Sequence, residues 1–128
     1  MNKLKKNLIL AGGVVLVILG LFHASFLLNP LWNSELSKVS NEMYSLVQML
    51  NIGLITMLLA LGVIFILLRN EMSASRLSNA LLLAVSLFLA SRLIAGLVLK
   101  SDTIAATIVF FVCTALYMIP AFIKRKDE

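Results

Sequence analysis

Four long apolar stretches, separated by short polar segments, dominate the pattern of the chain. They cover about residues 8–28, 44–68, 77–99 and 103–123, and each is close to the roughly 20 helical residues that cross about 30 Å of hydrocarbon. Their apolar residues do not alternate with polar ones, as they would in a membrane β-strand. We therefore predict an all-α fold, an integral membrane antiparallel four-helix bundle that forms one domain over residues 1–128.

The segments between the spans carry local helix signals. Asn29 followed by Pro30 is typical of a helix N-terminus, and the residues after them predict a short amphipathic helix in the first loop. Lying at the membrane surface, it would place Trp32 at the level of the headgroups. Tight turns are expected before the third and fourth spans, with Asp102 capping the fourth and Lys100 complementing the C-terminus of the third.

Composition and charge agree with a membrane protein. The chain is 61% apolar and 13% charged, whereas a soluble domain has about a quarter of its residues charged. The net charge of +5 follows from an uneven distribution that predicts orientation. Two basic residues, Lys38 and Lys100, lie on one side of the predicted membrane. The other side has Lys3, Lys5, Lys6, Arg69, Arg76, Lys124, Arg125 and Lys126.

This asymmetry predicts a multi-pass protein of the inner (cytoplasmic) membrane with both termini in the cytoplasm. Membrane lipids are the expected partners, a membrane-protein partner or a second copy of the chain is an open alternative, and nucleic acid is excluded as a partner. The first span has the basic start of a signal peptide, but Phe22-His23-Ala24 lacks the two small residues of a cleavage site. We expect this span to be retained. Cys113, the single cysteine, is interpreted as a packing residue.

Polar side chains inside the predicted spans are the candidate functional residues. His23, Asn51 and Arg92 lie at a similar depth, about 6 to 8 Å from the centres of their spans at 1.5 Å per residue. Gln48 shares a helix face with Asn51, and Asn79 lies close enough to the cytoplasmic surface to reach water. We predict an outer-leaflet pocket for a lipid headgroup, a quinone or another amphiphile. Its lining residues are His23, Gln48, Asn51, Arg92 and Thr107, with Tyr44 at the rim and Trp32 as a candidate lid.

The ionised Arg92 side chain needs a partner, and no span supplies an acid. The candidates are Glu35, Glu42 and Asp102 in the loops, a lipid phosphate, backbone carbonyls, water or an anionic ligand. In the alternative interpretation the protein is a structural, holin-like or immunity-like subunit, and these polar residues only clamp helices together.

The sequence argues against most enzyme classes. No buried carboxylate is available for proton coupling, and no second histidine, acid or cysteine at the level of His23 could complete a metal site. We expect no cofactor and no metal. Haem ligation through His23, and a small transporter component or membrane enzyme that uses His23 for proton transfer, remain as further alternatives.

Single residues also suggest a family resemblance. Phe22-His23 late in the first span, Trp32 in the loop, Asn51-Ile52 in the second span and Arg92 late in the third resemble a group of small uncharacterised four-span bacterial membrane proteins. The architecture is also similar to that of DoxX-like proteins. The resemblance covers about residues 22–92, implies a four-helix bundle and implies no activity.

Overall fold

The computed structural model describes residues 3–100 and 102–123. The basic residues 124–126, used above for the orientation, lie outside this range. The described part is helical, without strands, and its elements are α1 (Lys3–Leu27), α2 (Pro30–Leu36), α3 (Asn41–Leu67), α4 (Arg69–Ala74), α5 (Arg76–Val98) and α6 (Ile104–Phe122). Four of these, α1, α3, α5 and α6, are long and apolar enough to cross a membrane. The predicted all-α membrane fold is confirmed.

Two elements differ from the predicted boundaries. Helix α1 begins at Lys3, inside the basic head, because Lys and Leu are good helix formers and nothing in the head interrupts the helix. The tight turn expected before the third span contains a short helix, α4, with Glu71 in its first turn, where the helix dipole favours an acid. Met72 and Ser73 of α4 are buried. Packing of these two side chains explains why this segment is helical.

The chain divides into two compact units, residues 1–12 with 65–128 and residues 13–64. We call them the first unit and the second unit and describe each by itself. The expectation of one domain stays a prediction.

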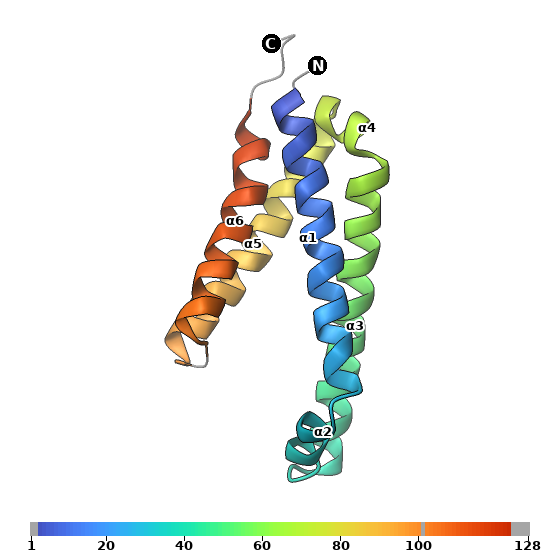
Figure 1. Ribbon diagram of the computed structural model, residues 1–128, viewed down its shortest axis with the longest axis vertical. Helices are drawn as coiled ribbons and strands as arrows, with labels where there is room; N and C mark the ends of the chain where they lie inside the picture. Colours follow the sequence, from blue (N-terminus) through green and yellow to red (C-terminus); the bar gives the residue numbers. More distant parts are fainter. Residues whose placement is uncertain (1–2, 101, 124–128) are drawn as a thin grey trace. The chain divides into compact units, whose positions relative to one another are not determined.

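In the first unit, α5 and α6 run side by side and are joined by a short turn (Figure 1). Their contact face buries Leu82 and Leu89 of α5 and Cys113 of α6, which agrees with a packing role for the cysteine. The Ser86 hydroxyl, also fully buried, donates to the backbone oxygen of Thr114 at 3.2 Å. A hydroxyl bond across two helices is typical of packing within a membrane.

Within the first unit, Tyr117 of α6 contacts the beginning of α1. Its side chain is fully buried, its hydroxyl donates to the backbone oxygen of Gly12, and its ring centroid lies 5.9 Å from that of Phe65. A Cβ atom at Gly12 would lie only 2.6 Å from Cε1 of Tyr117. Gly12 therefore makes room for the tyrosine ring that its own carbonyl binds.

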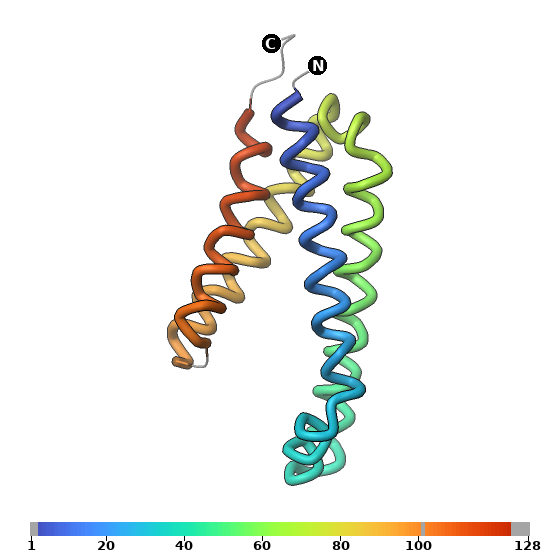
Figure 2. Tube along the Cα trace, viewed as in Figure 1, coloured from blue at the N-terminus to red at the C-terminus, as the bar shows by residue number. Residues whose placement is uncertain are grey.

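In the second unit, α1 and α3 run side by side, with α2 near their connected end (Figure 2). Glycines allow the two helices to approach closely. A Cβ atom at Gly62 would lie 2.8 Å from the backbone oxygen of Gly13 and 2.7 Å from Cγ2 of Val17, and one at Gly20 would lie 2.8 Å from Cδ2 of Leu59. Small residues at an interface commonly allow close packing of membrane helices.

The helix caps follow the sequence in one case and differ in another. The side chain of Asn29 accepts from the backbone N–H groups of Leu31 and Trp32, and Pro30 opens α2, as predicted. At α6 the cap is Thr103, whose hydroxyl oxygen accepts from the backbone N–H of Ala106 at 3.2 Å. The prediction that Asp102 caps this helix is wrong, because the Asp102 carboxylate binds Arg92 instead.

Lys100, in the turn between α5 and α6, has a φ of 51°. The left-handed conformation costs a residue with a side chain about 1 to 2 kcal/mol, whereas glycine adopts it freely. A cation near a helix C-terminus returns about 0.3 to 1 kcal/mol through the helix dipole. The cost of the backbone conformation is at least as large as the gain from the dipole, so local stability does not favour lysine over glycine at this position.

Candidate functional site

The predicted site residues are divided between the two units. Arg92 and Thr107 belong to the first unit. The second unit contains the other five, His23, Trp32, Tyr44, Gln48 and Asn51. A single pocket formed by all seven therefore stays a prediction, and the two groups are described in turn.

Within the second unit, polar side chains connect α2 to its neighbours. The side-chain N–H of Asn33, on α2, donates to the backbone oxygen of Leu27 at 3.2 Å. Gln48, on α3, lies with its Nε2 atom 3.5 Å from the Asn33 side-chain oxygen and 3.4 Å from the Tyr44 hydroxyl. These long contacts place Gln48 next to Tyr44, as their spacing of four residues predicts. The beginning of α3 and the loop helix α2 thus share one polar network.

Three polar atoms in the same region are buried and have no hydrogen-bond partner among the described residues. They are Nε1 of Trp32, Oε1 of Gln48 and Nδ2 of Asn51. Two of these groups donate and one accepts. All three residues belong to the predicted site. Buried polar atoms are usually paired, and leaving one unpaired costs about 1 to 3 kcal/mol. These atoms therefore mark the part of the second unit where a polar partner would contribute most.

His23 lies in a cluster of aromatic rings near the end of α1. Its ring centroid is 5.8 Å from that of Phe22 and 6.2 Å from that of Phe26, and the Phe26 ring lies 5.2 Å from Trp32. Nδ1 of His23 is 2.8 Å from the backbone oxygen of Leu19. Because a carbonyl oxygen only accepts, Nδ1 carries the proton in the neutral ring and Nε2 is left as an acceptor.

In the first unit, Arg92 has a carboxylate partner. Nη1 and Nη2 of Arg92 donate to the two oxygens of Asp102 at 2.8 and 2.9 Å, a bidentate geometry that is among the stronger charged contacts. The Arg92 side chain is 42% exposed and that of Asp102 8%. The guanidinium carbon also lies 4.9 Å from the centroid of the Phe110 ring. Asp102, one of the candidate partners named from the sequence, is therefore the residue that binds Arg92.

Gly96 makes this ion pair sterically feasible. It lies one helical turn after Arg92, and a Cβ atom there would lie 1.8 Å from Oδ2 of Asp102 and 2.9 Å from Nη1 of Arg92. The hydrogen bonds from Arg92 lower the pKa of the Asp102 carboxyl below its ordinary value, against an opposing effect of desolvation. The carboxylate is therefore charged at neutral pH, and Arg92 is neutralised within its own unit.

Beside this ion pair lies a cavity of about 350 Å³. It is formed by the end of α5, by Lys100 and Asp102, and by the first two turns of α6. The lining residues are Gly96, Leu97, Lys100, Asp102, Ile104, Thr107 and Ile108. The predicted residue Thr107 is among them, and its hydroxyl donates to the backbone oxygen of Thr103 at 3.1 Å.

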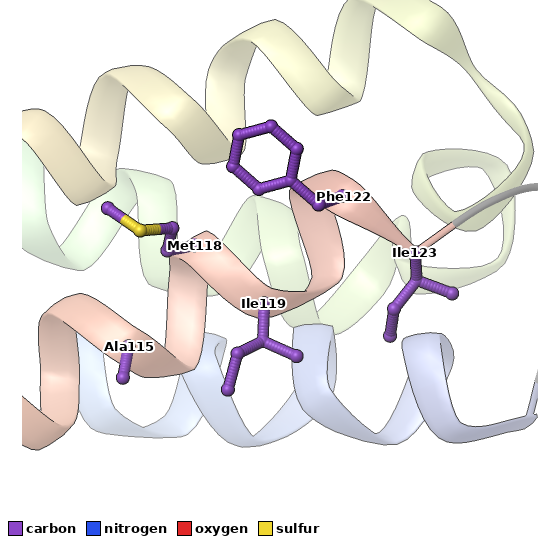
Figure 3. Close-up of a pocket in the computed structure, with 5 residues that line it drawn as sticks. All are labelled: Ala115, Met118, Ile119, Phe122 and Ile123. Atoms are coloured by element: carbon purple, nitrogen blue, oxygen red, sulfur yellow. The ribbon is translucent and has the colours of Figure 1, made fainter.

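A second cavity, of about 480 Å³, lies along the last turns of α6 (Figure 3). Its five lining side chains come from α6 and the residue after it, and all are apolar. They are Ala115, Met118, Ile119, Phe122 and Ile123. Such a surface can contact lipid chains but has no group that would select a ligand.

Two polar contacts were missed by sequence reasoning. Nζ of Lys5, a buried residue, donates to the side-chain oxygen of Asn79 at 2.7 Å, although Lys5 was interpreted as a topology signal and Asn79 as reaching water. Their common position near one membrane surface was the available signal. Tyr117 was missed as well. Its hydroxyl contact with Gly12 could not be found from spacing, since the two residues lie 105 positions apart.

In residues 3–100 and 102–123, no three His, Cys, Asp or Glu side chains come together in a group that could hold a metal ion. Comparison of the chain with known protein families, with curated proteins and with solved structures finds no match.

Proposed function

We propose that this protein is a membrane binding or accessory protein that holds the polar headgroup of an amphiphile at the outer end of the second unit. The observation that supports the proposal is the group of three buried, unpaired polar atoms on Trp32, Gln48 and Asn51. A ligand with both acceptor and donor atoms would pair all three, and each pair would contribute about 1 kcal/mol or more. The aromatic rings of Phe26 and Trp32 offer an adjacent apolar surface.

The charges of the second unit favour a headgroup without net negative charge. Lys38 is the one Lys or Arg between Gly13 and Ile64, and its ammonium pairs with Glu35 at 2.5 Å. The charge of Arg92, in the first unit, is compensated by Asp102. A quinone or an uncharged lipid headgroup fits this environment better than a free phosphate does.

The uneven distribution of basic residues supports an inner-membrane location with cytoplasmic termini, so that the site would face the outer leaflet. In a Cys113→Ala background, a cysteine replacing the exposed Ser34 of α2 should react with a membrane-impermeant maleimide in intact cells. Labelling only after lysis would contradict this orientation.

The binding proposal is tested by removing single polar atoms. Trp32→Phe keeps an aromatic ring and removes the N–H donor, and Asn51→Leu removes the amide. Native mass spectrometry of the purified protein should show a co-purified amphiphile in the wild type, with occupancy reduced about tenfold in each variant. That reduction corresponds to about 1.4 kcal/mol. The ligand-free variants should be at least as stable as the ligand-free wild type, because each loses a buried unpaired atom.

Thr56→Val is the matched control, because the Thr56 hydroxyl on α3 already donates to the backbone oxygen of Ile52 at 2.9 Å. This variant should keep the amphiphile. Equal occupancy in wild type, Trp32→Phe and Asn51→Leu would refute the proposal.

The second candidate function is a structural subunit, and the first unit favours it. There the polar side chains pair with one another, Arg92 with Asp102 and Lys5 with Asn79, as helix clamps would. Under this alternative Asn51→Leu lowers the stability of the protein in detergent and leaves any bound lipid unchanged.

A further inference from the structure

The cavity at the turn between α5 and α6 lies outside the site proposed above, and its charges differ from those of the second unit. Arg92 and Asp102 neutralise each other through two hydrogen bonds. Lys100 also lines the cavity, and its ammonium has no ion-pair or hydrogen-bond partner among the described residues. The cavity therefore carries one uncompensated positive charge.

The cavity lies where two candidate membrane spans end. Val98 ends α5 and Ile104 begins α6, and both helices are candidate membrane spans, so the turn between them lies at a membrane surface. The walls that continue along the spans are apolar and largely exposed, formed by Leu97, Ile104 and Ile108. A charged end beside an apolar wall is suited to an amphiphile that has an anionic group above its acyl chains.

The other polar side chains near the cavity, those of Thr107 and Asp102, are less suited than Lys100 to contact an anion. The Thr107 hydroxyl donates its proton to the backbone oxygen of Thr103. The Asp102 carboxylate would repel an anion, but Arg92 compensates its charge. The left-handed backbone at Lys100 would be more stable with glycine. Backbone stability therefore does not explain why this position has a lysine.

We propose that this cavity binds the phosphodiester of a membrane phospholipid, with the Lys100 ammonium as its cation and Leu97, Ile104 and Ile108 against the first part of the acyl chains. The volume of about 350 Å³ is at the lower end of the range for ligand pockets, which suits a headgroup whose chains remain in the bilayer. The proposal is independent of the amphiphile site in the second unit.

The backbone conformation at Lys100 provides a sharp test. Lys100→Gly removes the charge and relieves the left-handed strain, so the variant should fold at least as well as the wild type. Lys100→Arg keeps the charge and serves as the matched control. Binding of phosphatidylglycerol to the full-length, delipidated protein is measured by native mass spectrometry. Diacylglycerol with the same acyl chains serves as the ligand without phosphate.

We expect the wild type and Lys100→Arg to prefer phosphatidylglycerol over diacylglycerol. Lys100→Gly should weaken phosphatidylglycerol binding about fivefold, the ratio that corresponds to about 1 kcal/mol for one basic residue at a lipid surface, while its thermal stability is unchanged or higher. Equal binding in Lys100→Gly, or equal binding of the two lipids by the wild type, would overturn the proposal. Displacement of the lipid by millimolar inorganic phosphate would also overturn it, since the cavity would then be a site for free phosphate.

Discussion

Close contact between α1 and α3 in the second unit depends on Gly62, and replacing this residue by alanine tests the packing directly. The new Cβ atom would lie 2.7 Å from Cγ2 of Val17, 2.8 Å from the backbone oxygen of Gly13 and 3.0 Å from the backbone N of Val17. Two of these three atoms belong to the backbone, so the clash cannot be relieved by rotating a side chain. Overpacking of this kind costs about 1 to 3 kcal/mol.

Gly53, on the same helix, provides the matched control because a Cβ atom there meets no atom within 4 Å. Both substitutions gain the same intrinsic helix preference of alanine over glycine, about 1 kcal/mol, so their difference isolates the packing term. Gly53→Ala should be unchanged or more stable by up to about 1 kcal/mol. Gly62→Ala should be less stable than Gly53→Ala by about 1 to 3 kcal/mol.

The assay is equilibrium unfolding in mixed micelles, followed by the fluorescence of Trp32, the single tryptophan of the chain and a member of the second unit. Gly20→Ala should give an intermediate result. The closest atoms to its Cβ would be Cδ2 and Cγ of Leu59, at 2.8 and 2.9 Å, and a flexible side chain can move. If Gly62→Ala and Gly53→Ala agree within about 0.5 kcal/mol, the usual error of additivity, the packing argument is refuted.

Three other predictions concern the first unit. Tyr117→Phe should lower its stability by about 0.5 to 1.5 kcal/mol, because the buried hydrogen bond to the carbonyl of Gly12 is lost, and unchanged unfolding would contradict this role. Because the folded-state pKa of Asp102 is lowered, its ion pair contributes stability above the unfolded-state pKa of about 3.9 and loses it as the pH falls through the lower folded-state value. Thermal unfolding between pH 3 and 7 should therefore show an acid loss in the wild type that Asp102→Asn lacks. Gly96→Ala should give the profile of Asp102→Asn, since its Cβ would lie 1.8 Å from Oδ2 of Asp102, and a wild-type profile would show that the carboxylate keeps its partner.

The sequence was sufficient to predict which residues belong to the candidate site, but not which partners they bind. Gln48 and Asn51 were found because polar side chains are rare in apolar spans, and Trp32 because aromatic residues favour the level of the headgroups. A buried atom of each has no partner among the described residues. The partner of Arg92 stayed open between three loop acids, a lipid phosphate, backbone carbonyls, water and an anionic ligand, because charge alone does not indicate which group lies within reach. Asp102 is selected because Gly96 leaves room for its carboxylate beside Arg92.

The sequence by itself determined the four spans and the short loop helix. These features depend on local properties, the length of an apolar run and a cap such as Asn29 before Pro30. Only the tertiary structure decided which helix faces pack and which polar groups meet, as for Tyr117 with Gly12 and Lys5 with Asn79. The physical reason is that lipid is as apolar as the interior of the protein, so apolar residues surround each helix and no amphipathic pattern marks the buried face.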